Sequence, residues 1–446
     1  MPSPGVPQLL LFSAPDAPTL RQRVTVARDA YLNDTSRDLA SLAQSNRAAA
    51  LPLPHRAFAV WRDRDDAAKV FPDSGRPGIT LGVCDRPTGA PSFLFPGFGE
   101  HYPGMGRELY RTFAEFRHWV DRCCEHLETD SGLSVLSLIT EDPAADAGSG
   151  DSRRVFARMV GREPAPSRRS LPTELAHPST FVLEFSLVQL LRGLGVRPRA
   201  LLGHSLGEYV AACVSGVMTL RDALRVVATR ARLMRDVPPG AMLAVQSGAN
   251  DLRMYSEAGV TLAAVNSDSS SVLVGPEPAI AAVARSLMGA GIACRYVETA
   301  QGFHSLAMAS IAPSVRELVA SVPLSRPAVP FVSNVTGSWI TDAEAQAPDY
   351  WVRHMCSTVQ FAGGAETLFR LGHHVILEVG PGQSLASFVK QHRGCTREQA
   401  ATTVSVMPSR HYAQSELATF LACLGQLWMA GVNLDWTGVL AEDATR

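Results

Sequence analysis

An apolar strand that runs directly into a serine flanked by glycines is the feature that most restricts how this chain can fold. Residues 201–209 read Leu-Leu-Gly-His-Ser-Leu-Gly-Glu-Tyr, which places Ser205 in a Gly-X-Ser-X-Gly turn before a helix-forming run. Strand, turn and helix in this order form a nucleophile elbow: the glycines allow the tight turn, and the helix N-terminus presents N–H groups to an oxyanion. The segment therefore predicts an α/β fold with Ser205 as a nucleophile. An ordinary glycine-rich turn between a strand and a helix is the alternative.

A serine hydroxyl becomes a competent nucleophile only with a base beside it, so a histidine should approach Ser205 from elsewhere in the chain. Among 12 histidines, the candidate is His304, in the segment Gln-Gly-Phe-His-Ser at 301–305. A second strand, at 92–95, also ends in a glycine-rich turn (Pro-Gly-Phe-Gly) and could bring a backbone N–H to the same site. A plain junction between a strand and a loop explains that second segment equally well.

The hydrophobic pattern between Ser205 and His304 indicates an inserted module. Over residues 241–298, short apolar strands and helical stretches alternate in the order βαββαβ, with the first helix expected at 250–257. This order is that of a ferredoxin-like fold. We therefore expect a small ferredoxin-like subdomain inserted into a larger one.

The predicted fold class of the whole chain is α/β, and 446 residues suggest two or three units. A large α/β-hydrolase-like subdomain with a parallel sheet is expected over 91–240 and 299–410, between an N-terminal α/β domain at 1–90 and a closing segment at 411–446. The polar, irregular stretch at 141–173 is expected to be a surface excursion. Apolar strands are expected at 8–13, 56–61, 329–332 and 375–378, and helices at 17–33, 38–47, 179–192 and 415–430.

The overall composition excludes several classes of function. A formal net charge of −1, from 41 basic and 42 acidic residues, gives no electrostatic reason to expect a nucleic acid or an anionic membrane as partner. No apolar run reaches the length of a membrane span, and the N-terminus lacks the pattern of a signal peptide. The 8 cysteines are scattered, which fits neither a disulfide framework nor a zinc site. We therefore expect a cytoplasmic protein without a metal site.

Seven motifs in a fixed order carry a resemblance to a known family. They are FLFPGFG, GHSLGEY, TRARLM, AAVN, GFHS, YWVRH and LEVGPG, and they extend over residues 92–435 together with their flanks. In this order they resemble the acyltransferase domains of modular polyketide synthases and the related malonyl-CoA:acyl-carrier-protein transacylases. The first ninety residues resemble the small domain that links a ketosynthase to its acyltransferase, and the stretch from Leu427 resembles the segment just after such domains.

The resemblance assigns roles to the catalytic residues. It implies that Ser205 is the nucleophile and His304 its general base and acid, with the backbone N–H groups of Leu206 and Phe98 as the oxyanion hole. The family commonly has glutamine where this chain has Phe98, so only the backbone donor is retained. In the family a backbone carbonyl orients the histidine, and the YWVRH segment places that carbonyl at His354.

The resemblance also implies a substrate with a free carboxylate. Arg230 lies where the family has the arginine that pairs with this carboxylate, and its planar guanidinium suits bidentate binding. Arg232 is the competing candidate. An uncharged acyl chain would leave a confined guanidinium unpaired, which is costly.

The three residues before His304 bear on the choice of acyl group. Malonyl-specific members of the family usually have His-Ala-Phe there and methylmalonyl-specific members Tyr-Ala-Ser, whereas this chain has Gln301, Gly302 and Phe303. The Phe303 ring is expected to crowd an α-methyl group, so malonyl is favoured. One methyl group is worth only about 1–3 kcal/mol, so this selectivity is expected to be incomplete.

Together these features predict a ping-pong acyltransferase without a metal or redox cofactor. Its expected substrates are malonyl-CoA, or a related acyl-CoA, and an acyl carrier protein, and its expected neighbour is a ketosynthase of the same synthase. Two other classes stay open. A serine hydrolase would place a triad acid between serine and histidine, and Asp251 and Asp268 are the acids there to consider. A catalytically silent scaffold domain is the non-enzymatic alternative.

Overall fold

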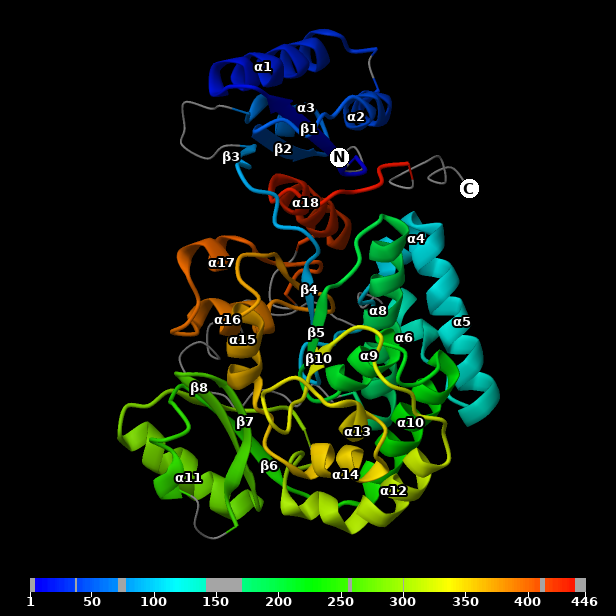
Figure 1. Cartoon of the computed structure of the whole chain (residues 1–446), viewed down its shortest axis with the longest axis vertical. Helices are drawn as coiled ribbons and strands as arrows, with labels where there is room; N and C mark the ends of the chain where they lie inside the picture. Colours follow the sequence, from blue (N-terminus) through cyan, green and yellow to red (C-terminus); the bar gives the residue numbers. More distant parts are fainter. Residues whose placement is uncertain are drawn as a thin grey trace, which may run out of the picture.

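The computed structural model describes residues 5–36, 38–70, 78–141, 171–255, 259–299, 301–409 and 414–437. Its strands form three separate sheets, of three, five and four strands. Figure 1 shows the N-terminal sheet at the top, the five-stranded sheet in the middle and the four-stranded sheet at the lower left. The expected surface excursion at 141–173 falls almost entirely on residues 142–170, which lie outside the described part.

The central sheet is entirely parallel, as predicted. Its strands β4 and β5 have the almost continuously apolar segments SFLF and ALLG, and both strands are buried along their whole length. This pattern is expected for a parallel sheet that is covered on both faces. In spatial order the strands are β10 (Phe331–Val332), β5 (Ala200–Gly203), β4 (Ser92–Phe95), β11 (Ile376–Glu378) and β12 (Thr403–Ser405).

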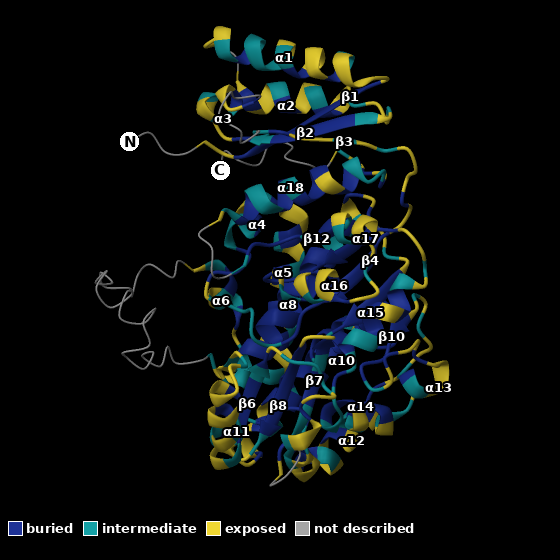
Figure 2. Ribbon diagram, turned by 90° about the vertical axis from the view of Figure 1, so that its left-hand side faces the viewer, coloured by how far each residue is buried: buried dark blue, intermediate teal, exposed yellow. Residues whose placement is uncertain are grey.

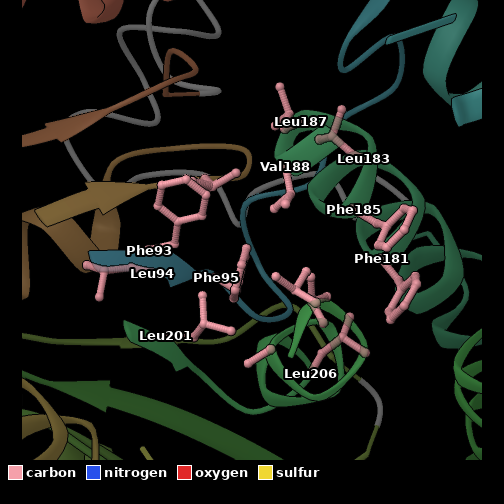
Figure 3. Packing of buried hydrophobic residues seen from close by; sticks show 14 of the residues in the cluster. Phe93, Leu94, Phe95, Phe181, Leu183, Phe185, Leu187, Val188, Leu201 and Leu206 are labelled. Carbon is pink, nitrogen blue, oxygen red and sulfur yellow. The ribbon is translucent and has the colours of Figure 1, made fainter. Parts of the chain in front are cut away.

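Helices on both sides of this sheet bury its side chains. The central one is α8 (Thr173–Gly193), which packs against α5 (Ala114–Ser131), α10 (Leu220–Leu233) and α9 (Gly207–Val214). Figure 3 shows side chains of β4, β5 and α8 that belong to one core cluster together with Leu206, just before α9. The remaining helices of this part are α4 (Arg107–Thr112), α6 (Leu136–Thr140), α12 (Ala312–Ala320), α13 (Asp342–Ala345), α14 (Pro348–Cys356), α15 (Phe361–Phe369), α16 (Ser384–Gln391) and α17 (Arg397–Ala401), with 3-10 turns at Met234–Asp236 and Leu306–Ile311.

The N-terminal sheet is antiparallel and is covered on both faces. Alternate residues of β1 pack in opposite directions: Leu10 and Phe12 join the small core under α1 and α2, while Leu9 and Leu11 join the main core. Helix α18 lies against β1 and β2 on the second face (Figure 1). The elements are β1 (Gln8–Ala14), α1 (Ala17–Asn33), α2 (Leu39–Ala48), β2 (His55–Trp61), α3 (Arg64–Ala68), β3 (Thr80–Val83) and α18 (Glu416–Met429).

The four-stranded sheet has the spatial order β7-β8-β6-β9, with antiparallel neighbours throughout. This is the strand order of a ferredoxin-like fold. Its second helix, α11, forms as expected, whereas the first expected helix is a 3-10 turn at Arg253–Tyr255 in the described residues. The bounds are β6 (Ala241–Val245), β7 (Thr261–Ser267), β8 (Ser270–Gly275), α11 (Glu277–Gly289) and β9 (Cys294–Tyr296).

Burial decides where the elements differ from the sequence prediction. Helix α8 starts at Thr173 rather than at 179 and contains Pro178, because nearly all of its residues are buried and packing outweighs one missing N–H donor. Figure 2 shows this contrast: α8 is dark blue, while α1 exposes one yellow face. None of the described helices has both the length and the apolar composition of a membrane span.

Candidate active site

Two glycines give the nucleophile turn its shape. A Cβ atom on Gly203 would lie 2.1 Å from the backbone N of Glu208, and one on Gly207 would lie 2.1 Å from the carbonyl O of Phe95. Both distances are far below contact distance to backbone that cannot move aside. The Gly-X-Ser-X-Gly pattern is therefore required by the close packing of β4, β5 and α9.

The structure brings Ser205 and His304 together. The Ser205 Oγ lies 2.6 Å from Nε2 of His304, although the two residues are 99 positions apart. Among the described residues they are also the only ones other than glycine with a left-handed backbone, at φ values of +55° and +57°. Such a conformation costs on the order of 1–3 kcal/mol per residue and persists where surrounding structure enforces it, typically at functional sites.

A backbone carbonyl orients the imidazole of His304. Its Nδ1 lies 3.0 Å from the carbonyl O of Ser357, the residue that caps the C-terminus of α14. The carbonyl of His354, to which the sequence assigns this role, makes a smaller contribution that also favours the protonated ring. The main acceptor therefore lies at the C-terminal cap of α14, one turn beyond His354, the residue expected from the sequence.

The surroundings keep His304 neutral. Burial is the largest cause, and the positive charge of Arg230 adds to it, so that the pKa of His304 is lowered to about 3. A neutral Nε2 with Nδ1 donating to a carbonyl can accept the proton of the Ser205 hydroxyl. At neutral pH the imidazole is therefore unprotonated, as a general base must be.

Two backbone N–H groups remain available for an oxyanion. Within the described part, the N–H groups of Leu206 and Phe98 have no protein acceptor, whereas the N–H of Ser205 donates to Oδ1 of Asn334 at 2.6 Å. The loop that carries Phe98 packs tightly on the elbow, since a Cβ atom on Gly97 would lie 2.6 Å from the carbonyl O of His204. The arrangement fits the predicted oxyanion hole, in which each donor is worth about 3 kcal/mol.

Arg230 lies close to this pair and is almost unpartnered. Its side chain is buried, with 2% exposed, and its guanidinium stacks 5.0 Å from the ring centre of Tyr209. Its Nε and Nη1 atoms have no hydrogen-bond partner among the described residues. Arg232, the competing candidate, is exposed and donates to the carbonyl of Ser131 at 2.8 Å. The geometry therefore separates the two arginines: Arg230 is buried near Ser205 and His304, whereas Arg232 lies at the surface.

Aromatic rings form the wall beside the nucleophile. The rings of Phe98 and Phe303 meet edge to face, with their centres 5.7 Å apart, and the centre of the His177 ring lies 5.6 Å from each of these centres. The side chain of Gln301 accepts a hydrogen bond at Oε1 from Oγ1 of Thr173 at 3.3 Å. Gly302 has no room for a side chain, because a Cβ atom would lie 2.8 Å from Val274. Of the three residues before His304, Phe303 is the one whose ring contacts Phe98 and His177.

Several residues at the site were not found from the sequence. His177 is buried with 3% exposed, neither ring nitrogen has a partner in the described structure, and burial followed by the charge of Arg230 lowers its pKa. A polar side chain within the apolar run of α8 was the available signal. Asn334 and Ser357 belong to separate segments after the inserted subdomain, and no local pattern marks them.

The acids expected of a hydrolase triad lie elsewhere. Asp268 accepts the backbone N–H of Arg393 at 2.8 Å, and Asp251 lies beside Ser247 at 3.4 Å. The acceptor at Nδ1 of His304 is a carbonyl oxygen. A triad with a carboxylate is thus not formed by these two residues.

Comparisons with known proteins identify the family of the chain. The family model described as "Acyl transferase domain" matches residues 92–434. A component of the phenolphthiocerol/phthiocerol polyketide synthase of Mycobacterium tuberculosis is 32% identical over 97% of this chain. The chain spans only 28% of that relative and 17% of the spectinabilin polyketide synthase protein NorB of Streptomyces orinoci, which is also 32% identical.

Solved structures of the same kind superpose over nearly the whole chain. The acyl transferase domain of SpnD, in complex with 2-(pent-4-yn-1-yl)malonyl, has a TM-score of 0.82 at 30% identity and covers 98% of both chains. The acyl transferase domain of ZmaA has a TM-score of 0.82 at 26% identity and covers 97% of this chain. On the family match, the relatives and these folds, the chain belongs to the acyl transferase domain family of polyketide synthases.

Proposed function

We propose that this acyltransferase takes a malonyl group from malonyl-CoA, holds it as an ester on Ser205 and passes it to the phosphopantetheine thiol of an acyl carrier protein. The observation that carries this proposal is the buried guanidinium of Arg230, unpartnered at Nε and Nη1 in the described structure, beside the Ser205–His304 pair. A buried cation without a partner is costly, so an anionic group of the substrate is its natural partner. A malonyl group carries such a carboxylate.

The first half-reaction forms the ester. Nε2 of His304 accepts the hydroxyl proton as Ser205 Oγ attacks the thioester carbonyl, and the N–H groups of Leu206 and Phe98 stabilise the oxyanion. The C–S bond then breaks, and the departing CoA sulfur takes the proton from His304. The carboxylate of the malonyl group pairs with Arg230 throughout, which holds the reacting carbonyl in place.

The second half-reaction reverses these steps with a different thiol. The phosphopantetheine thiol of the carrier protein gives its proton to His304 and attacks the Ser205 ester. The ester C–O bond breaks and His304 returns the proton to Ser205. No metal or redox cofactor is required in this scheme, and the N-terminal unit at 1–90 would connect the enzyme to a ketosynthase.

Malonyl is the proposed preference over methylmalonyl. The ring centres of Phe98, Phe303 and His177 lie within 5.7 Å of one another, and we expect an α-methyl group beside them to be crowded by Phe303. The SpnD domain has a 2-substituted malonyl group in its complex, so the fold itself permits larger groups. The preference therefore rests on these side chains.

A competition experiment tests the proposal. Equal concentrations of malonyl-, methylmalonyl- and acetyl-CoA are offered, and the acyl-enzyme is identified by the mass of the intact protein before a phosphopantetheinylated carrier protein is added. We expect a malonyl-enzyme that is stable until the carrier protein discharges it. Preferential loading of acetyl would remove the role proposed for Arg230, and rapid release of free malonate without an acceptor would show a hydrolase.

A further inference from the structure

The side chain of Asn334 spans the strained nucleophile from behind. Its Nδ2 donates to the carbonyl O of Gly203 at 2.6 Å, and its Oδ1 accepts the backbone N–H of Ser205 at 2.6 Å. Asn334 lies just after β10, next to β5 in the sheet, and is buried with 2% exposed. One amide group thus bonds the backbone on both sides of the elbow.

Asn334 is itself fixed by buried groups. Its backbone N–H donates to Oε2 of Glu208 at 2.6 Å, and its carbonyl accepts from the N–H of Gln360 at 2.8 Å. Glu208 is fully buried, and its Oε1 accepts from the hydroxyl of Tyr350, which also lies 2.7 Å from Oγ of Ser333. These contacts leave the amide little freedom to rotate.

The same network reaches the base. Tyr350 belongs to α14, and the carbonyl of Ser357 at the end of α14 orients His304. One helix of nine residues therefore anchors Asn334 through Glu208 and orients the imidazole directly. Helix α14 therefore helps to position both Ser205 and His304.

We propose that Asn334 is a positioning residue for acyl transfer, whose amide clamps Gly203 and Ser205 and holds the Ser205 hydroxyl in line with His304. The proposal rests on the function proposed for that pair. Without the clamp, Ser205 can relax from its left-handed backbone toward ordinary regions, which displaces Oγ. The clamp also occupies the N–H of Ser205, so that the oxyanion is left to Leu206 and Phe98.

Two substitutions separate positioning from a purely structural role. Asn334→Ala removes both bonds. In Asn334→Asp, the protonated carboxyl group matches the amide, because its O–H can donate to the carbonyl of Gly203 and its other oxygen can accept the N–H of Ser205. The ionised carboxylate can only accept, so it loses the bond to Gly203. The activity of Asn334→Asp should therefore rise as the pH falls.

The titratable groups facing this position must be controlled for. They are Glu208 on α9, Tyr350 and His354 on α14, and His204 and His304 at the site itself. The wild-type enzyme contains all five, so its own pH profile over the same range is the reference. Thr336→Ala is the matched control within the turn after β10, since Oγ1 of Thr336 accepts from the N–H of Ser338 but the residue is exposed.

The experiment measures the single-turnover rate of malonyl loading per active site, from about pH 8 down to about pH 6, with thermal unfolding of each variant alongside. We expect roughly a 10- to 100-fold slower rate for Asn334→Ala, the loss typical of a displaced catalytic group. Asn334→Asp should be slow at the higher pH and approach the wild-type rate at the lower one, while Thr336→Ala loads normally. The proposal is overturned if Asn334→Ala is folded and loads malonyl at the wild-type rate. It is also overturned if Asn334→Asp loads as slowly as Asn334→Ala at every pH. Failure of the wild-type enzyme to load, or loading by Ser205→Ala, would instead count against the proposed function.

Discussion

At the scale of single residues, the backbone strain of this chain is concentrated where the chemistry is proposed. Every other described residue with a left-handed backbone is a glycine, whereas Ser205 and His304 adopt it despite their side chains. Next to them, Asn334 accepts the backbone N–H of Ser205, and the carbonyl of Ser357 accepts from the ring of His304. The strain is therefore best understood as the means by which a hydroxyl and an imidazole are aimed at each other.

The low pKa of His304 has a consequence for the pH profile. Because burial and Arg230 lower the pKa of His304 to about 3, the free enzyme should keep a neutral base well below the ordinary histidine pKa of about 6.5. We expect kcat/KM for malonyl loading to stay nearly constant between about pH 7 and about pH 5. A stopped-flow measurement of loading across this range checks the expectation. A loss of activity with an apparent pKa near 6.5 would show that the imidazole is not shielded in this way.

Replacing Arg230 should change which acyl groups the enzyme accepts. Arg230→Ala removes the proposed partner of the substrate carboxylate, so we expect malonyl loading to fall by about 100-fold or more, which corresponds to about 3 kcal/mol. Loading of acetyl-CoA should fall much less, because acetyl has no carboxylate. Arg232→Ala, on the same helix but outside the site, is the matched control and should behave as wild type. An equal loss with both acyl-CoA substrates would contradict the role assigned to Arg230.

The Phe303 ring should set the cost of an α-methyl group. Phe303→Ser removes it from the wall it forms with Phe98 and His177, and we expect the ratio of methylmalonyl to malonyl loading to rise by roughly 10-fold or more. Paired measurements of kcat/KM with the two substrates give this ratio. If the substitution lowers both values equally and leaves the ratio unchanged, selectivity lies elsewhere.

The sequence predicts the parts of the site that sit within short motifs. Ser205, His304 and Arg230 belong to segments whose local pattern carries the chemistry, and the structure brings them close together. Asn334 bonds Ser205 across 129 positions, and Ser357 bonds His304 across 53. Their side-chain or backbone roles depend on how distant segments pack, so no local pattern could identify them.

At the scale of elements, the strands with continuous apolar residues were predicted well, whereas several other elements were not. The parallel strands β4 and β5 follow from their continuous apolar residues. Strand β12 was not anticipated, because its three residues Thr403–Ser405 have polar ends and gain their order from β11 beside them. Helix α8 begins before Pro178 for the same reason: tertiary burial outweighs local preference.

Two helix N-termini cap each other across the molecule. Glu416, at the start of α18, accepts from the N–H groups of Gly106 and Glu108 at 2.8 and 3.1 Å. Glu108 in turn accepts from the N–H of Leu417 at 2.9 Å and from the hydroxyl of Ser415. Since α18 lies on the N-terminal sheet, these reciprocal hydrogen bonds of Glu416 and Glu108 fasten the N-terminal sheet to the central part.

Removing one side of these reciprocal hydrogen bonds should destabilise the protein. Glu416→Ala leaves the N–H groups at the start of α4 without their acceptor, and we expect the free energy of unfolding to fall by about 1–3 kcal/mol. Chemical denaturation followed by circular dichroism measures the change. Glu125→Ala, an exposed residue of α5, is the control and should change the value by less than about 0.5 kcal/mol. Equal effects of the two substitutions would mean that the reciprocal hydrogen bonds contribute nothing.

At the scale of the whole molecule, the N-terminal and central sheets are joined by contacts that involve α18. The guanidinium of Arg56 donates to the carbonyl of Trp428 and lies over its ring at 5.1 Å, and Thr88 donates to the carbonyl of Ala430 at 3.0 Å. The domain limits drawn from the sequence stay a prediction. Through these contacts, α18 and the residues just after it connect the N-terminal sheet to the central part.

Buried carboxyl groups should make the stability of the whole chain depend on pH. Burial raises the pKa of Glu208 to about 8 and that of Glu378 to about 7, from an ordinary value of 4.5. The folded chain keeps these protons at a pH where the unfolded chain has released them, so the free energy of unfolding falls as the pH rises through these values. The buried histidines, whose pKa values are lowered, affect stability only below about pH 6.5.

We therefore expect the enzyme to unfold at a lower temperature at about pH 9 than at about pH 7, by an amount corresponding to roughly 1–3 kcal/mol. Thermal unfolding in buffers of equal ionic strength measures this difference. Glu208→Gln cannot ionise at this position and should show a smaller decrease. A Tm that is constant or higher at the alkaline pH would show that these carboxyls ionise normally.

The most direct measurement is the site of acylation. Wild-type enzyme and Ser205→Ala are incubated with malonyl-CoA, and the mass of each intact protein and of its proteolytic peptides is determined. We expect one malonyl group on the wild-type protein, located on the peptide that contains Ser205, and none on the variant. A malonyl group on another residue, or equal labelling of both proteins, would contradict it.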